Sequence, residues 1–300
     1  MQRPSDIYPL ANAIVGLHQA SLALSEAQPV PRTTQTDLVY RAALQACSHL
    51  GFIAPDAECL AHAWQAQTAR MGHFDPNHWP DKPEDFGLQA PAERFAPCPQ
   101  SLGLYAVLPD AAWVDRMARA GVPTVQLRYK SDDAAAIAAE VAAAVQAVQG
   151  TTARLFINDH WQAALAAGAY GIHLGQEDLD AMRPQDLAQI RAAGLRLGVS
   201  THGYAEMLRA HAIGPSYIAL GAVFPTTLKR MATAPQGLGR LAAYVRLMQD
   251  YPLVAIGGIG LEQFPAIRAT GVGSIAVVRA LVNAADPEAA AFTLLQAMAD

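Results

Sequence analysis

Charge is scarce in this chain and is not clustered. Asp, Glu, Lys and Arg make up 16% of the 300 residues, and the formal net charge is −5. Proteins that hold nucleic acid by its phosphates carry a basic patch, and no run of Lys and Arg occurs here. No apolar run approaches the roughly 20 residues that cross a membrane as a helix. We therefore expect neither nucleic acid nor a membrane as a partner.

Cysteine is also scarce, with three residues at positions 47, 59 and 98. They form no C-x-x-C pair, so no zinc or redox site is predicted. An odd, sparse cysteine count is typical of a reducing compartment. The first ten residues, "MQRPSDIYPL", lack the charged and apolar regions of a secretory signal. We therefore expect a cytoplasmic protein.

The first 95 residues differ in composition from the rest. Apolar residues recur at helical spacing in residues 7–27, 34–50 and 55–71, with Thr34 or Thr36 as the expected cap of the second helix. Residues 72–87 are rich in Pro, Asp and aromatic residues, which indicates an irregular linker. No Gly-rich phosphate loop is present in this region. We expect residues 1–95 to be a helical extension and linker without assigned activity, used for packing or oligomerisation.

From Leu102 onward, eight short apolar runs alternate with Ala-rich helical segments. Eight strand–helix units in about two hundred residues are typical of a (β/α)8 TIM barrel. A doubly wound open sheet is the alternative. We therefore predict an α/β barrel domain over residues 96–300, with helices ending at Gly before the next strand. The runs are residues 102–108, 124–130, 154–159, 170–176, 195–201, 216–224, 253–259 and 274–278, and the glycines are Gly121, Gly168, Gly194 and Gly271.

Polar residues gather where these predicted strands end. The run "TVQLRYK" places Gln126, Arg128 and Lys130 on one strand face, because alternate residues of a strand point the same way. Active sites of TIM barrels lie at the carboxyl ends of the strands, so we take as candidates the polar residues there and the small residues after the last two strands. They are Gln126, Arg128, Lys130, Asn158, Asp159, Asp178, Ser200, Thr226, Thr227, Lys229, Gly257, Gly258, Val278 and Arg279.

The types of these side chains predict two anion sites. Backbone N–H groups around Gly257, Gly258, Val278 and Arg279 suit one phosphate. A second anion is expected at Arg128, Lys130 and Lys229, because guanidinium and ammonium groups both suit phosphate oxygens. Carboxylates beside a polyphosphate are the usual ligands of Mg²⁺, which makes Asp159 and Asp178 candidates. Two separate sites indicate two substrates, one a diphosphate and one a monophosphate.

Simpler interpretations stay open for single residues. Asp159 and Asp178 can form salt bridges with the nearby cations, and Arg128 and Lys130 can be a solvated pair. Asp159 or Ser200 can cap a helix. His173 shares strand-face parity with two glycines, so we expect it to point inward as a hydrogen-bonded core histidine rather than as a catalyst.

Residues from about Phe95 to the C-terminus resemble the thiamine-phosphate synthase family, also called thiamine-phosphate pyrophosphorylase. The matching strings include "VQLRYK", "RLFINDHW", "AYGIHLGQEDL", "AGLRLGVSTH", "PSYIALGAVFPT" and "YPLVAIGGI", in family order. The resemblance implies coupling of hydroxymethylpyrimidine diphosphate to thiazole phosphate, or its carboxylated form, with Mg²⁺ as cofactor. The products are thiamine phosphate and pyrophosphate. Loss of diphosphate precedes attack by the thiazole nitrogen.

The resemblance also implies roles for single residues. It makes Asp159 and Asp178 the Mg²⁺ ligands. Two positions depart from the family pattern: Leu228 stands where a hydroxyl residue is expected, and Arg279 follows Val278 where serine is common. The pyrimidine diphosphate contacts are Gln126, Arg128, Lys130, Asn158, Ser200 and Lys229, and the thiazole phosphate contacts are Thr226, Thr227, Gly258, Val278 and Arg279.

Two rival functions stay open, as does the oligomeric state, for which a homo-oligomer is one possibility. One rival is a thiazole tautomerase, which resembles the synthase but holds no diphosphate. The other is a non-catalytic sensor of phosphate ligands with the N-terminal helices as its output. The set of cations and paired carboxylates favours the synthase. The N-terminal helices followed by residues 73–87 are similar to the C-terminal end of hydroxymethylpyrimidine phosphate kinases, which are sometimes fused to this synthase.

Overall fold

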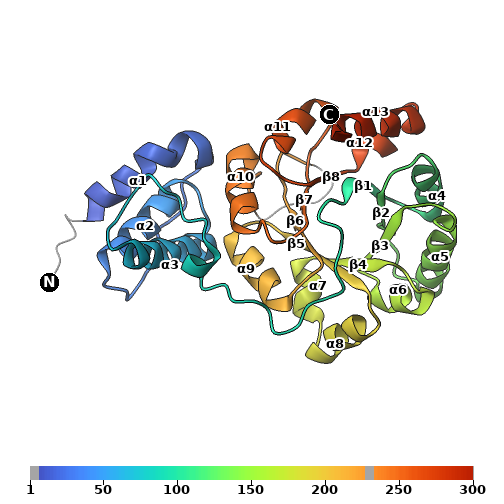
Figure 1. Cartoon of the computed structure of the whole chain (residues 1–300), viewed down its shortest axis with the longest axis horizontal. Helices are drawn as coiled ribbons and strands as arrows, with labels where there is room; N and C mark the ends of the chain where they lie inside the picture. Colours follow the sequence, from blue (N-terminus) through green and yellow to red (C-terminus); the bar gives the residue numbers. More distant parts are fainter. Residues whose placement is uncertain (1–6, 227–232, 300) are drawn as a thin grey trace.

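The computed structural model, which describes residues 7–226 and 233–299, contains a closed barrel of eight parallel strands in sequence order (Figure 1). The predicted TIM barrel is therefore confirmed, and the open sheet is wrong because β1 pairs with β8. The strands are β1 (Gly103–Leu108), β2 (Thr124–Leu127), β3 (Arg154–Asn158), β4 (Gly171–Leu174), β5 (Arg196–Thr201), β6 (Tyr217–Leu220), β7 (Leu253–Ala255) and β8 (Ser274–Val277).

Helices surround this barrel and follow the strands in turn (Figure 1). All four glycines predicted to end helices have φ between 67° and 88°, the left-handed conformation that a glycine adopts without strain. The helices are α4 (Ala111–Arg119), α5 (Ala134–Ala147), α6 (Trp161–Ala167), α7 (Gln176–Ala181), α8 (Pro184–Ala192), α9 (Tyr204–Ile213), α10 (Gly237–Leu247), α11 (Phe264–Arg268), α12 (Arg279–Val282) and α13 (Pro287–Ala299), with a short 3-10 turn η3 (Leu261–Gln263) before α11.

The barrel interior is filled by aromatic rings that fit against glycines on neighbouring strands. Tyr105, Phe156 and Tyr217 form one buried cluster with smaller residues of the other strands. A Cβ atom at Gly198 would lie 2.1 Å from the ring of Tyr217, and one at Gly171 would lie 2.6 Å from that of Phe156. The two glycines therefore make room for large side chains, and the barrel is packed rather than hollow.

Three helices precede the barrel: α1 (Ile7–Leu22), α2 (Leu38–His49) and α3 (Ala54–Met71), followed by the 3-10 turn η2 (Pro83–Phe86). The three predicted helices are thus confirmed, although α1 stops five residues early. The predicted cap of α2 was wrong. Asp37 caps this helix by accepting a hydrogen bond from the Tyr40 N–H, because it stands directly before the first helical residue. We call residues 7–87 the N-terminal unit.

The N-terminal unit packs on α9 and α10 of the barrel (Figure 1). Phe52 and Trp79 from the unit meet Tyr204 of α9 in a cluster of rings with centroids about 6 Å apart. The indole N–H of Trp79 donates to the Tyr204 hydroxyl at 2.9 Å, and Phe86 stacks on the same tyrosine. Tyr204 and Phe52 are almost fully buried, so this contact resembles a domain core.

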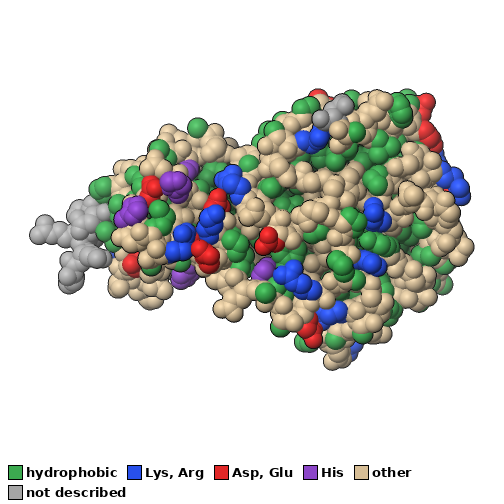
Figure 2. Space-filling view, in the orientation of Figure 1, with side chains coloured by type: hydrophobic (Ala, Val, Ile, Leu, Met, Phe, Trp, Pro, Cys, Tyr) green, Lys and Arg blue, Asp and Glu red, His purple; other side chains and the backbone are tan. Residues whose placement is uncertain are grey.

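The surface between the unit and the barrel carries charges of both signs (Figure 2). Arg246 of α10 pairs with Asp81 of the unit at 3.4 Å in an exposed position. Within residues 7–226 and 233–299, no helix is long and apolar enough to span a membrane.

Candidate active site

A chain of buried hydrogen bonds crosses the barrel interior. The Tyr105 hydroxyl donates to the Gln126 Oε1 atom at 2.7 Å and lies 2.7 Å from the Tyr217 hydroxyl. The Gln126 Nε2 atom donates to the Asn158 Oδ1 atom at 2.9 Å. His173 links the other end, with Nδ1 at 2.6 Å from the Tyr217 hydroxyl. The chain therefore joins side chains of β1, β2, β3, β4 and β6.

The direction of this chain follows from proton counting. Tyr105 has one hydroxyl proton and gives it to Gln126, so Tyr217 must donate to Tyr105. The Nδ1 atom of His173 must then donate to Tyr217, which leaves its Nε2 atom as an acceptor. Ser200 lies 2.8 Å from that Nε2 atom and so donates its hydroxyl proton to it. Burial lowers the pKa of His173 to about 4, so the ring is neutral as this arrangement requires.

His173 therefore points inward as a hydrogen-bonded core histidine, as the sequence predicted. Ser200 does not cap a helix: the residue before α9 is Gly203, and the Ser200 hydroxyl is turned to His173. Tyr105 and Tyr217 were missed by the sequence analysis. Both stand at apolar positions of their strands, where a buried tyrosine gives the same pattern as phenylalanine. The one available signal was Gly198, which lies opposite Tyr217 on the next strand.

Two carboxylates and a lysine meet where β2, β3 and β4 end. The Lys130 Nζ atom lies 2.8 Å from the Asp159 Oδ2 atom. Asp178, in the first turn of α7, accepts the Gly175 N–H at 2.7 Å. Burial first, and then the nearby Asp159 carboxylate, raise the pKa of Asp178, so the two acids face each other. The salt bridge to Lys130 that the sequence left open is therefore present.

Asp159 has an unusual backbone. Its φ of 63° is the one positive value at a non-glycine residue among those described. Such strain at the end of a strand is typical of functional sites. Asp159 does not cap α6, an alternative that the sequence left open, because the residue before α6 is His160 and no side chain caps that helix. The backbone instead turns the Asp159 carboxylate toward Lys130.

This pair of acids fits Mg²⁺. Mg²⁺ is commonly held by one or two carboxylates, with substrate oxygens and water completing its shell. No cluster of three or more His, Cys, Asp or Glu side chains occurs among the residues that the structure describes, so a closed site made by protein alone is not found there. Asp159 and Asp178 would hold the metal together with a substrate.

Arg128 directly follows β2 and stands two residues before Lys130 in the chain. Its backbone N–H continues the β2 pairing by donating to the Leu108 carbonyl at 2.8 Å. The guanidinium makes no hydrogen bond or ion pair within the described part of the chain and is half-buried. Lys130 is more exposed, with 59% of its side chain accessible. Lys130 is thus paired with Asp159, whereas the Arg128 guanidinium has no protein partner among the described residues.

The glycines after β7 lie against the segment that follows β6. Gly257 and Gly258 have φ of 106° and 66°. A Cβ atom at Gly257 would lie 2.5 Å from that of Ala222, and one at Gly258 would lie 2.4 Å from the Pro225 carbonyl oxygen. Only glycine fits both positions. Val278 precedes α12 and Arg279 opens it, so these candidates also lie at a strand end.

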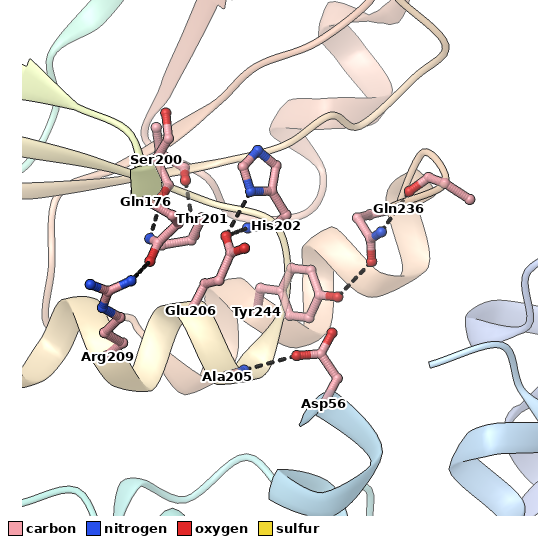
Figure 3. A network of polar contacts seen from close by, with 12 residues as sticks. Asp56, Gln176, Ser200, Thr201, His202, Ala205, Glu206, Arg209, Gln236 and Tyr244 are labelled. Carbon is pink, nitrogen blue, oxygen red and sulfur yellow. Dashed lines mark hydrogen bonds and ion pairs between the residues drawn. The ribbon is translucent and has the colours of Figure 1, made fainter. Parts of the chain in front are cut away.

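Three positions of the sequence analysis, Thr227, Leu228 and Lys229, lie outside the described residues, whereas Thr226 lies within them. Other polar contacts surround Ser200 (Figure 3). The Gln176 Nε2 atom donates to the Ser200 carbonyl at 2.7 Å, and Arg209 donates to Gln176. His202 and Glu206 pair at 2.6 Å on the same rim. These contacts hold the β5 end in place.

Residues 104–281 match the protein family described as Thiamine monophosphate synthase. A thiamine-phosphate synthase of Neisseria meningitidis serogroup A is 56% identical over 195 residues, which cover 65% of this chain and 94% of that relative. One from Escherichia coli O6:H1 is 54% identical over 203 residues, covering 68% and 95%. The solved thiamine phosphate pyrophosphorylase from Pyrococcus furiosus aligns with a TM-score of 0.59 and 30% identity, covering 66% and 96%. With a match that runs from β1 to α12, the chain belongs to the thiamine monophosphate synthase family.

Proposed function

We propose that the enzyme couples hydroxymethylpyrimidine diphosphate to thiazole phosphate, giving thiamine phosphate and pyrophosphate. The observation that carries this proposal is the arrangement of Lys130, Asp159 and Asp178 at the ends of β2, β3 and β4, with Arg128 two residues before Lys130 in the chain. A site with cations and two facing acids suits a diphosphate that leaves together with a divalent metal. Residues 96–300 are the proposed catalytic domain.

The reaction begins at the bond between the pyrimidine methylene carbon and the diphosphate oxygen. When this bond breaks, the electron pair goes to the leaving diphosphate, whose negative charge grows in the transition state. Arg128 and Lys130 stabilise that growing charge more than the ground state, which is what accelerates a reaction. Asp159 and Asp178 would hold Mg²⁺, which would neutralise part of the same charge. Lys229 is a further proposed diphosphate contact.

The pyrimidine ring is proposed to lie over the polar chain of the barrel interior. Gln126, Asn158 and Ser200 present their remaining donors and acceptors at this level of the barrel. Their directions are fixed by Tyr105, Tyr217 and His173, so little reorganisation accompanies the reaction.

The thiazole nitrogen then supplies the lone pair that forms the new carbon–nitrogen bond. Its phosphate is proposed to bind the backbone at Gly257, Gly258, Val278 and Arg279, with Thr226 and Thr227 nearby. No side-chain nucleophile is required. The partners of the enzyme are thus two small phosphorylated molecules.

Purified protein supplied with both substrates and Mg²⁺ tests the proposal, with thiamine phosphate and pyrophosphate measured together. Lys130→Ala and Asp178→Ala should each lower kcat about 100-fold, because each removes stabilisation of the leaving group. Lys82→Ala is a matched control, since Lys82 is an exposed lysine of the N-terminal unit. Near-normal rates in both site variants would place the diphosphate elsewhere. Thiazole isomerisation without pyrophosphate release would identify a tautomerase instead.

A further inference from the structure

The contact between the N-terminal unit and the barrel contains a buried arginine. Arg240, in the first half of α10, is 2% exposed. Its Nε atom donates to the Leu22 carbonyl at 2.9 Å, and its Nη2 atom donates to the Leu50 carbonyl at 2.8 Å. The guanidinium also lies 3.6 Å from the ring centroid of Phe52. A buried charge is costly, so this side chain needs compensating partners.

Those partners are the ends of two helices. Leu22 is the last residue of α1, and Leu50 is the C-cap of α2. Carbonyls at a helix C-terminus lack partners within the helix and carry partial negative charge. A cation donating to both ends satisfies them and interacts favourably with both dipoles. Arg240 of the barrel therefore caps two helices of the N-terminal unit.

A matching contact runs in the opposite direction (Figure 3). Asp56 of α3 is 3% exposed, and its Oδ1 atom accepts the Ala205 N–H at 2.8 Å in the first turn of α9. A carboxylate at a helix N-terminus complements the positive end of the dipole. Gly203, which precedes α9, leaves the space that this carboxylate occupies. The unit and the barrel thus cap each other's helices.

The third donor of Arg240 contacts Gln236, the residue that precedes α10. Its Nη1 atom lies 3.2 Å from the Gln236 Oε1 atom, which also accepts the Tyr244 hydroxyl at 2.8 Å. The Gln236 Nε2 atom donates to the Ala234 carbonyl at 2.6 Å. Gln236 is 5% exposed, so every polar atom of its amide is held by protein.

The backbone of Gln236 ties together the two ends of the β6–α10 connection, which is described at residues 221–226 and 233–236. The N–H groups of Gln236 and Gly237 donate to the carbonyls of Ala222 and Val223 at 2.8 and 2.9 Å. The N–H groups of Val223 and Phe224 in turn donate to the carbonyls of Ile256 and Gly257. We call the paired residues 222–223 and 236–237 the neck. The neck thus helps to position Gly257 and Gly258, the two glycines that follow β7.

We propose that the N-terminal unit positions the thiazole-phosphate side of the active site, acting through Arg240 and Gln236 on the neck. Arg240, Gln236 and Tyr244 are positioning residues, since none is placed against substrate. This inference rests on the proposed function, because it takes the backbone at Gly257 and Gly258 as the site of the thiazole phosphate. It assigns a role to the part of the chain that the family match, residues 104–281, does not include.

Steady-state kinetics with each substrate varied in turn tests this assignment in the full-length chain. Arg240→Met keeps an unbranched side chain but removes all three donated bonds. We expect the KM for thiazole phosphate to rise about tenfold, as for the loss of one well-placed interaction, while the KM for the pyrimidine diphosphate changes less than twofold. Tyr244→Phe removes a single hydroxyl and should shift the same KM by a smaller factor. Arg240→Lys should restore part of the lost affinity.

Arg246→Ala is the matched control, because Arg246 lies on the same helix and pairs with the N-terminal unit, and within the described residues it forms no hydrogen bond or ion pair with the neck. It should leave both KM values unchanged. Wild-type protein that makes no thiamine phosphate would refute the proposed function itself. An active wild type, with unchanged thiazole phosphate KM in folded Arg240→Met and in Tyr244→Phe, would overturn the positioning role alone. If Arg240→Met does not fold, Tyr244→Phe decides by the same criterion.

Discussion

Asp56 should make the stability of this enzyme depend on pH. Its carboxyl is buried between α3 and α9, and burial raises its pKa from 3.8 to about 6. The backbone N–H donors of Ala205 and Tyr204 and the charge of Arg240 oppose that rise, and Glu206 adds to it. Between pH 4 and 6 the folded state therefore binds more protons than the unfolded state, so the unfolding free energy falls as pH rises.

The size of this effect follows from the two pKa values. A difference of about two pH units corresponds to about 3 kcal/mol over the full titration, of which about 1.4 kcal/mol falls between pH 5 and pH 7. Asp56→Asn removes the titrating group and keeps an amide oxygen that can still cap α9. The variant should thus lose this part of the pH dependence without losing the fold.

Urea unfolding of wild type and Asp56→Asn at pH 5, 6 and 7 measures the difference in unfolding free energy between the two proteins. Its change between pH 5 and 7 should be about 1.4 kcal/mol, with the variant gaining relative stability at the higher pH. Asp186→Asn is a control that should give a nearly constant difference over this range, because the Arg183 side chain lowers the pKa of Asp186 from 3.8 and the carboxyl is then ionised in both states at pH 5 and above. If the difference in unfolding free energy between wild type and Asp56→Asn does not change with pH, the reasoning is refuted, since Asp56 would then be solvated rather than buried against α9.

Two further substitutions probe the barrel interior. Gly198→Ala places a Cβ atom 2.1 Å from the Tyr217 ring, so it should lower the unfolding free energy by about 3 kcal/mol in urea denaturation. Gly16→Ala is the control, because nothing lies within 4 Å of its Cβ position, and it should be neutral or stabilising in the same measurement. Tyr217→Phe leaves the His173 Nδ1 donor unpaired, so it should lower the unfolding free energy by about 1–3 kcal/mol and reduce kcat through the lost orientation of Ser200. Tyr8→Phe, on the exposed face of α1, should change neither quantity, and an equal effect of both tyrosine variants would exclude a role for the buried chain.

Much of the fold was predictable because strand and helix periodicities alternate so regularly after residue 102. Strand ends were less predictable. The run "TVQLRYK" reads as strand to Lys130, but β2 ends at Leu127, because side-chain alternation does not reveal where ladder hydrogen bonds stop. The cap of α2 was wrong for a similar reason, since Thr34, Thr36 and Asp37 are all competent caps and only one starts the helix.

The candidate site was predictable to the extent that it follows the strand-end rule. That rule located Lys130, Asp159 and Asp178, which the structure brings together. It could not find Tyr105 and Tyr217, whose hydroxyls matter only because distant strands turn them toward each other. Contacts between Arg240 and the ends of α1 and α2 join residues about 200 positions apart, and no local pattern encodes such pairs.

The aromatic contact around Tyr204 bears on how the two parts of the chain depend on each other. Tyr204 and Arg240 belong to the barrel, yet both are buried and form hydrogen bonds with the N-terminal unit. Without the unit, these side chains would be exposed to water, as interface side chains are when an obligate dimer dissociates. Because one backbone joins the two parts, the unit docks at a high effective concentration and needs little affinity of its own. The unit thus behaves as a permanently tethered subunit of the barrel.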